Sequence, residues 1–445
     1  MRVKVLCRNP DEYLRETKRD IFKVPRNYSP ELHPLEGPRE YTRALNAIKL
    51  ERVFAKPFVG NLDGHREGVT CFGKHPERLS LVSSGSYDGE VCFWDLPSQT
   101  CVRRFQAHSG FVRGLTFVPD GNGLLSVGDD KTVKTWNTDS LFDSNEEPIE
   151  TRISKTVLTG ITHHQKKDIF ATCGEACLLW EETRNSPIQV YEWGVDTLLD
   201  VTFNAVETDL LLSCASDRSI IIYDVRDCGP VKKFVMSLRT NKLCWNPMEA
   251  TVFTCANEDY NLYTFDVRNL RSAVQVHKNH VSAVTCVDYA PTGREFVSGS
   301  FDKSIRIFEI DKANSRDIYH TKRMQHVTSV AWSLDNKYVL SGSDEMNVRV
   351  WKARASEKLG ALRPREKNAL NYSAALREKY ASHPQIKRIA RHRQVPKHIQ
   401  HAKKELSVIR TKLVRKEINR RKHAKPGAEE PYVPERKKSV IDVQQ

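Results

Sequence analysis

Seven aromatic residues at near-equal spacing constrain the fold of this chain more than any other feature of its sequence. Each closes a short apolar run, and most follow an acidic turn residue by six positions, as Trp94 follows Asp88. The seven are Trp94, Trp136, Trp180, Tyr223, Phe265, Phe308 and Trp351, at intervals of 42, 44, 43, 42, 43 and 43 residues. Six near-equal intervals are hard to obtain by chance, so we interpret the region as seven copies of one structural unit.

The length of this unit predicts a β-propeller, in which a blade of four short strands takes ~40–45 residues. Turn pairs such as Asp88-Gly89 and Asp130-Lys131 separate the middle strands, as a hairpin requires. The seventh unit ends on its third strand, so its fourth strand must come from elsewhere, and residues 56–62 would close the ring. We predict an all-β fold: an extended N-terminal arm (1–55), a seven-bladed propeller (56–351) and a C-terminal tail (352–445).

The units resemble those of the WD-repeat family, which open with Gly-His and close with Trp-Asp, as Gly64-His65 and Trp94-Asp95 do here. In that family a His, a Ser or Thr, the turn Asp and the Trp form a buried hydrogen-bond chain. The resemblance assigns this chain to His65, Ser84, Asp88 and Trp94 in the first blade, to His108, Ser126, Asp130 and Trp136 in the second, and to His280, Ser298 and Asp302 in the sixth. We interpret these residues as structural rather than catalytic, because a satisfied buried network holds a strand pair together. Units three, four, five and seven depart from the pattern.

Prolines and helical spacing set the flanks apart from the repeats. The arm is predicted to hold a helix from Pro38 to Phe54. In the tail, helices are predicted from Pro364 to about Tyr380, from Pro384, and from Pro396 to just before Pro426. The last one carries a narrow apolar stripe of Ile399, Ala402, Leu406, Ile409 and Leu413.

Charge is concentrated in the tail. The whole chain has a formal charge of +14, whereas residues 352–445 hold 26 Lys and Arg against 9 Asp and Glu, which is +17. A near-neutral body with a basic extension suggests a scaffold with an arm for a polyanion, and nucleic acid is the commonest one. A solubilising tail, a membrane-surface or calmodulin-type helix, and a helix whose apolar stripe docks on a partner are the alternatives. The lack of aromatic residues from 387 to 425 argues against the membrane.

Other classes of protein find little support in the sequence. No run approaches the ~18 apolar residues of a membrane helix, and Met1 to Leu14 lacks the apolar core of a secretory signal. The eleven cysteines are scattered without metal-type pairs, so we expect reduced thiols and no metal or other cofactor. We expect no enzyme, because phosphate loops and nucleophile motifs are absent and the His163-His164 doublet is expected at the opening of a degenerate blade.

Two further stretches resemble the WD-repeat and SOF-domain-containing family. They are residues 39–58 of the arm, beginning Arg39-Glu40-Tyr41, and the tail segment Ile386-Lys387-Arg388-Ile389-Ala390-Arg391-His392-Arg393. The resemblance implies a nucleolar component of the small-subunit processome, with pre-ribosomal RNA, a small nucleolar ribonucleoprotein and other processome proteins as partners. The residues that we expect to contact phosphates are Lys387, Arg388, Arg391, Arg393, Lys403, Lys404, Arg415, Lys416, Arg420, Arg421 and Lys422. The clusters 420–422 and 436–438 also fit nuclear import signals.

A second resemblance points to a different function. Blades four and five end with aromatic-Asp-x-Arg, as Tyr223-Asp224-Val225-Arg226 and Phe265-Asp266-Val267-Arg268. This is similar to the box with which propeller substrate receptors grip the adaptor of cullin-4 ubiquitin ligases, and it implies that Arg226 and Arg268 contact that adaptor. The alternative is that Asp and Arg have only a structural role and stabilise the end of a strand.

Overall fold

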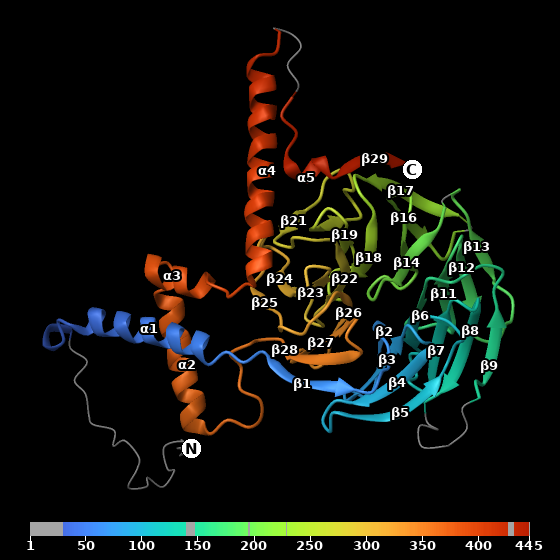
Figure 1. Cartoon of the computed structure of the whole chain (residues 1–445), viewed down its shortest axis with the longest axis horizontal. Helices are drawn as coiled ribbons and strands as arrows, with labels where there is room; N and C mark the ends of the chain where they lie inside the picture. Colours follow the sequence, from blue (N-terminus) through green and yellow to red (C-terminus); the bar gives the residue numbers. More distant parts are fainter. Residues whose placement is uncertain (1–29, 139–146, 195, 228, 426–430, 445) are drawn as a thin grey trace, which may run out of the picture. The chain divides into compact units, whose positions relative to one another are not determined.

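The structure is a computed structural model that describes residues 30–138, 147–194, 196–227, 229–425 and 431–444 (Figure 1). The chain forms two compact units. One comprises residues 57–355 and 393–445, and the other comprises residues 1–56 and 356–392. Residues 1–29 of the expected arm lie outside the described residues.

The first unit contains the seven-bladed propeller, as predicted, and each blade is an antiparallel sheet of at least four strands. Blades one to three are formed by β2 (Val69–Lys74), β3 (Leu81–Ser86), β4 (Glu90–Asp95) and β5 (Thr100–Gln106); β6 (Val112–Phe117), β7 (Gly123–Gly128), β8 (Thr132–Asn137) and β9 (Glu150–Ile153); and β10 (Gly160–His163), β11 (Ile169–Cys173), β12 (Cys177–Glu181) and β13 (Gln189–Tyr191). Blades four and five are formed by β14 (Leu198–Phe203), β15 (Leu210–Ala215), β16 (Ser219–Asp224) and β17 (Pro230–Met236); and by β18 (Thr240–Trp245), β19 (Val252–Asn257), β20 (Asn261–Asp266) and β21 (Gln275–Lys278). Blades six and seven are formed by β22 (Val284–Tyr289), β23 (Glu295–Ser300), β24 (Ile305–Glu309) and β25 (Asp317–Tyr319); and by β26 (Val327–Trp332), β27 (Tyr338–Ser343), β28 (Asn347–Lys352) and β1 (Phe58–Asp63).

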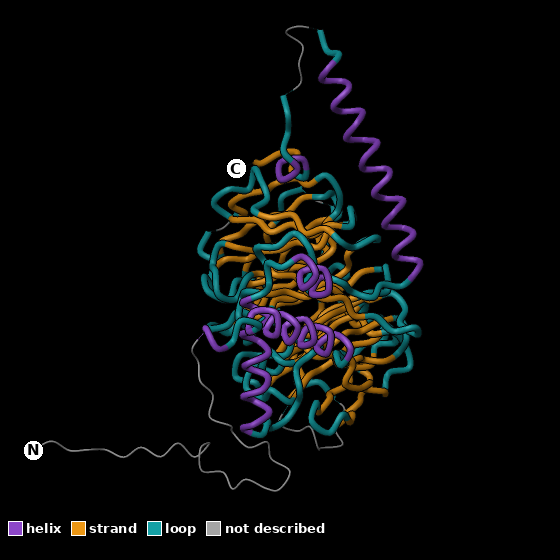
Figure 2. Tube along the Cα trace, turned by 90° about the vertical axis from the view of Figure 1, so that its left-hand side faces the viewer, coloured by secondary structure: helices purple, strands orange, loops and turns teal. Residues whose placement is uncertain are grey.

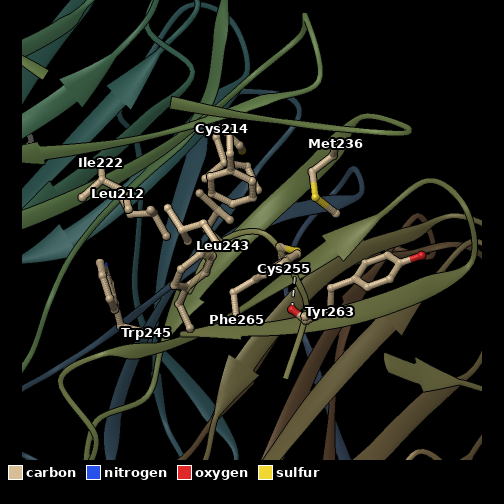
Figure 3. Close-up of a cluster of buried hydrophobic side chains, with 14 of the residues drawn as sticks. Leu212, Cys214, Ile222, Met236, Leu243, Trp245, Cys255, Tyr263 and Phe265 are labelled. Atoms are coloured by element: carbon tan, nitrogen blue, oxygen red, sulfur yellow. Dashed lines mark hydrogen bonds between the residues drawn. The ribbon is translucent and has the colours of Figure 1, made fainter. Parts of the chain in front are cut away.

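The repeating aromatic residues lie on the third strand of every blade, where each is at most 4 % exposed. Neighbouring blades share apolar cores, of which the one between blades four and five contains Leu212, Leu243, Trp245 and Phe265 (Figure 3). The aromatic residues recur once per blade because every blade buries its third strand in the cores that it shares with its neighbours.

The N-terminal segment closes the ring, as expected from the sequence. Strand β1 pairs antiparallel with β28, with Leu62 opposite Val348, and Leu62 is fully buried. The backbone N–H of Lys352 also donates to the carbonyl of Pro57 over 2.7 Å. Joining the first and last segments in one sheet leaves the array without open ends.

The second unit is helical and combines both flanks of the chain. It contains a short 3-10 turn, η2 (Pro30–Leu32), and the helices α1 (Glu36–Val53), α2 (Pro364–Lys379) and α3 (Pro384–Arg391). Its core is formed by Ala44 and Ile48 of α1, Leu376 of α2 and Ile386 of α3. Glu40 and Glu51 of α1 form ion pairs with Lys379 and Arg377 of α2.

The remainder of the tail belongs to the propeller unit and touches it before and after the long helix α4 (Lys397–Lys422). Figure 2 shows the C-terminal part of α4 extending away from the strands of this unit. Before α4, Arg393 donates from Nε to Asp317 Oδ1 over 2.8 Å, and in the first turn of α4 Ile399 is only 1 % exposed. After α4, the turn α5 (Glu435–Lys438) leads into β29 (Val440–Gln444), which pairs antiparallel with β17 of blade four.

Strand β29 corrects the expectation of a purely helical tail. Val443 lies opposite Phe234, and Val440 and Val443 pack on the core between blades four and five. The edge strand β17 offers unpaired backbone groups, and β29 satisfies them. Within the described ranges, no helix combines the length and apolarity that crossing a bilayer requires.

Candidate nucleic-acid and protein interfaces

The second blade links all four of its expected residues in one hydrogen-bond chain. His108 Nδ1 lies 2.9 Å from the Asp130 carboxylate, and His108 Nε2 lies 2.8 Å from Ser126 Oγ. The indole N–H of Trp136 donates to the same Ser126 oxygen over 2.9 Å. Burial lowers the pKa of His108, against the opposing effect of Asp130, so a neutral imidazole fits the chain.

The first blade contains a shorter chain. His65 Nε2 lies 2.5 Å from Ser84 Oγ, which accepts the indole N–H of Trp94 over 2.6 Å. Asp88, which the resemblance placed beside His65, instead accepts hydrogen bonds from Ser86 Oγ at 2.5 Å and from the Glu90 N–H at 3.2 Å. Burial lowers the pKa of His65 to about 4, although the Asp88 charge acts in the opposite direction.

The sixth blade ends its chain one residue early, as expected from Phe308. His280 Nδ1 lies 2.9 Å from Asp302 Oδ2, and His280 Nε2 lies 2.7 Å from Ser298 Oγ. Burial on its own would raise the pKa of Asp302, but His280 lowers it to about 2. The histidines and serines of all three networks are buried within their blades, and of these residues only His280 lines a cavity, the cleft of about 400 Å³ between residues 278–281 and α4.

The His163-His164 doublet does not lie at a blade opening, and that expectation is wrong. His163 is the last residue of β10, and its Nε2 lies 2.7 Å from Glu182 Oε1. His164 Nδ1 accepts the backbone N–H groups of Lys166 and Lys167 at 3.0 and 2.9 Å. Both rings therefore stabilise the turn between β10 and β11.

The two aromatic-Asp-x-Arg boxes occupy equivalent positions in adjacent blades. Asp224 and Asp266 are the last residues of β16 and β20, and each accepts the backbone N–H of its Arg two positions later, at 3.0 Å. Arg226 also donates from Nε and one terminal nitrogen to Asp224, at 2.9 and 2.7 Å, while its side chain stays 67 % exposed. Arg268 is exposed as well.

The expected phosphate contacts fall on three parts of the tail. Lys387, Arg388 and Arg391 are exposed on α3, in the helical unit. The residues of α4 are Lys403, Lys404, Arg415, Lys416, Arg420, Arg421 and Lys422, of which all but the half-buried Arg421 are exposed. The third part, Arg393 between the two helices, is largely buried in its ion pair with Asp317 and thus anchors the chain.

The apolar stripe of α4 packs only at its beginning. Ile399 is buried, whereas Ile409 and Leu413 are 52 % and 58 % exposed. Arg421 forms an ion pair with Glu417 at 3.2 Å and lies over the ring of Tyr432, 5.0 Å from its centroid. The end of the helix therefore packs on the returning chain through Tyr432.

Sequence reasoning did not single out a cleft of about 560 Å³ beside blade three. Trp180, Val190 and Trp193 form part of its mostly apolar lining, together with Lys155 and Glu175. Among the residues that the structure describes, no three His, Cys, Asp or Glu side chains are grouped as a metal site.

Comparisons with known proteins agree with this architecture. Residues 56–95, 99–137, 271–309 and 318–352 match the WD domain, G-beta repeat, and residues 353–440 match the Sof1-like domain. The chain is thus a WD-repeat propeller protein with a Sof1-like domain, which confirms the resemblance noted above. Blades three to five, which depart from the repeat pattern, lie mostly outside the matched stretches.

Several relatives that match over the full length share one name. DDB1- and CUL4-associated factor 13 is 59 % identical in Danio rerio and 58 % identical in Homo sapiens, over 444 residues that cover 100 % of this chain and of each relative. The protein of that name in Dictyostelium discoideum is 45 % identical over 398 residues, 89 % of both chains. The chain belongs to the family of DDB1- and CUL4-associated factor 13.

Proposed function

We propose that the chain is a non-catalytic scaffold that binds pre-ribosomal RNA within the small-subunit processome and supports maturation of 18S rRNA. The observation that carries this proposal is the basic tail, fifteen Lys and Arg against two Glu from residue 387 to 425, most of it exposed on α3 and α4. Such a surface binds a polyanion by releasing counterions and needs no base-specific contacts.

The Sof1-like domain supports the assignment to the processome. It matches residues 353–440 and so includes α3 and α4, the helices that present these cations, together with α2. A role in the processome places the chain in the nucleolus, with a small nucleolar ribonucleoprotein and other processome proteins as neighbours. The tail clusters 420–422 and 436–438 are suited to nuclear import.

The scaffold role is tested by replacing the endogenous protein in cells. Depletion is expected to lower 18S rRNA and to raise its precursors, and the full chain is expected to restore both. A variant with Lys387, Arg388 and Arg391 changed to Gln is expected to restore them only in part, because three phosphate contacts are lost. Unchanged 18S processing after depletion would contradict the proposal.

A second role as a receptor for a cullin-4 ligase is favoured by the two boxes and by the name of the relatives. Exposed Arg226 and Arg268 lie at the ends of neighbouring third strands, where one partner surface could contact both. Asp224 and Asp266 fix the two turns through backbone hydrogen bonds, so both arginines leave the sheet from matching positions.

The test is co-purification of the ligase adaptor with the full chain. Changing Arg226 and Arg268 together to Ala is expected to abolish recovery of the adaptor and to leave processome proteins unchanged. Arg239→Ala is the matched control, because Arg239 is an exposed, ion-paired arginine that precedes β18, at the opposite end of blade five from Asp266. Equal recovery with the double variant and the control would contradict the second role.

A further inference from the structure

Helix α4 and the loop that opens blade six enclose a cleft of about 400 Å³. One wall is formed by residues 278–281, which include His280 of the sixth-blade network, and the other by one side of α4 between Lys403 and Arg415. None of the eleven residues that line this α4 cleft is acidic. Both walls belong to the propeller unit.

The cations of the α4 cleft lack partners of their own. Among the described residues, Lys403, Arg410 and Arg415 form no ion pair or hydrogen bond, although Asp259 attracts Arg410 at longer range. Lys278 on the opposite wall is paired with Glu435. The cleft is therefore positive, and an anion inside it would be stabilised by three cations, of which only Arg410 is attracted by a described carboxylate at longer range.

A fourth cation lies close to the cleft. Arg306 of β24 is 2 % exposed, and its Nε has no hydrogen-bond partner among the described residues. Lys403 is exposed as a residue, yet partial desolvation of its ammonium group, followed by the charge of Arg306, lowers its pKa. Asp302 offsets part of the Arg306 charge, and a bound anion would offset the charge of Lys403.

The dimensions of the α4 cleft limit which kind of polyanion can bind in it. Lys403 and Arg410 are about 10 Å apart along the helix axis, and Arg415 follows after about 7 Å, at ~1.5 Å per residue. A volume of about 400 Å³ lies in the range of pockets for one small ligand, so it admits a nucleotide but not a duplex. Leu406 and Val414 offer apolar surface between the cations, on which a base can rest.

We propose that the α4 cleft clamps a single-stranded stretch of RNA, with Lys403, Arg410 and Arg415 each holding a phosphate. The inference rests on the proposed RNA-binding function and narrows it to one side of α4. RNA is favoured over an acidic protein segment because further Lys and Arg side chains follow along the rest of α4. A chain with one phosphate per nucleotide can contact them in succession. Single strands also bend enough to enter a short cleft.

The test compares two triple variants of the full chain in titrations with a fluorescent single-stranded RNA oligonucleotide. The cleft variant is Lys403→Gln, Arg410→Gln and Arg415→Gln. The matched control is Lys397→Gln, Lys412→Gln and Lys425→Gln, three exposed cations of the tail that neither line the cleft nor belong to the expected phosphate contacts. Both variants lose the same charge, and their urea unfolding midpoints verify that the fold is retained.

The cleft variant is expected to lower the affinity roughly a hundredfold at 0.1 M salt and to reduce the salt slope by about 2, at ~0.7 per phosphate contact. The control is expected to lose less than tenfold. Equal losses in both variants would overturn the α4 cleft while RNA binding stands, and no RNA binding by the unaltered chain would overturn the proposed function itself. Displacement of the RNA by a polyglutamate peptide of equal affinity would overturn RNA as the occupant.

Discussion

The hydrogen-bond chains of blades two and six predict different losses of stability for the same substitution. Ser126 in blade two connects two groups, the ring of His108 and the indole of Trp136. Ser298 in blade six connects the ring of His280 and makes only a long 3.5 Å bond to the Arg306 carbonyl, because Phe308 has no donor. Both serines are fully buried, so water cannot replace the missing hydroxyl in either Ala variant.

The expected magnitudes follow from the number of groups left unpaired. A buried polar group without a partner costs about 1–3 kcal/mol, so Ser126→Ala should lower the free energy of unfolding by about 2–6 kcal/mol and Ser298→Ala by about 1–3 kcal/mol. Ser98→Ala is the control, since Ser98 is exposed and its substitution should change stability by less than about 0.5 kcal/mol.

Urea unfolding of the full chain, followed by circular dichroism, measures these differences as shifts of the midpoint. The account requires the order Ser126→Ala, then Ser298→Ala, then Ser98→Ala. Equal shifts for the two buried serines would refute the reasoning, because the indole of Trp136 would then contribute nothing through its hydrogen bond.

Three further perturbations address the pH response, the ring closure and the tail. Because burial lowers the pKa of His65 from 6.5 to about 4, its contribution of roughly 3 kcal/mol to the free energy of unfolding is present above pH 6.5 and is lost as the pH falls to 4. Asp302, with its pKa lowered to about 2, adds a further loss below pH 4. Stability in urea that does not change between pH 7 and 4.5 would contradict this. Leu62→Ala should cost about 2–5 kcal/mol because Leu62 is fully buried in the closing strand, and a loss below 1 kcal/mol in thermal unfolding would argue against closure by β1. Val443→Asp should release β29 from β17 and speed proteolysis after residue 430, whereas an unchanged digestion pattern would mean that the pairing does not hold the tail.

Much of the fold could be predicted because it repeats. The seven aromatic positions recur because each one is buried on the third strand of its blade. Blade seven lacks a fourth strand of its own in the repeat pattern, which predicts that residues 56–62 provide it. Hairpin turns were also visible: Lys131 and Lys303, which follow turn aspartates, have φ of 62° and 61°, and Gly89 at φ 88° has no room for a Cβ beside the His108 carbonyl. Local patterns are sufficient when every unit makes the same contacts.

Contacts between distant segments left weaker signals in the sequence. The helix α1 shares a core with α2 and α3, yet nothing in the spacing of Ala44 or Ile386 indicates which surface each one meets. Residues 440–444 are too few to indicate a strand without the edge of β17 to pair with. The charge of Arg393 led to the prediction of a phosphate contact. Its hydrogen bond to Asp317, which the sequence does not indicate, shows that Arg393 instead anchors the chain.

The central claim, that a propeller scaffold binds pre-ribosomal RNA through its basic tail, is tested most directly by RNA crosslinking and sequencing in cells. The full chain should be compared with the cleft variant at Lys403, Arg410 and Arg415 rather than with a truncation, because removing the tail also removes α2, α3 and β29. The account predicts reads concentrated on the 18S precursor and its small nucleolar RNA for the full chain, and their strong reduction in the variant. Scattered reads with the full chain would contradict it and leave the ligase receptor as the better account.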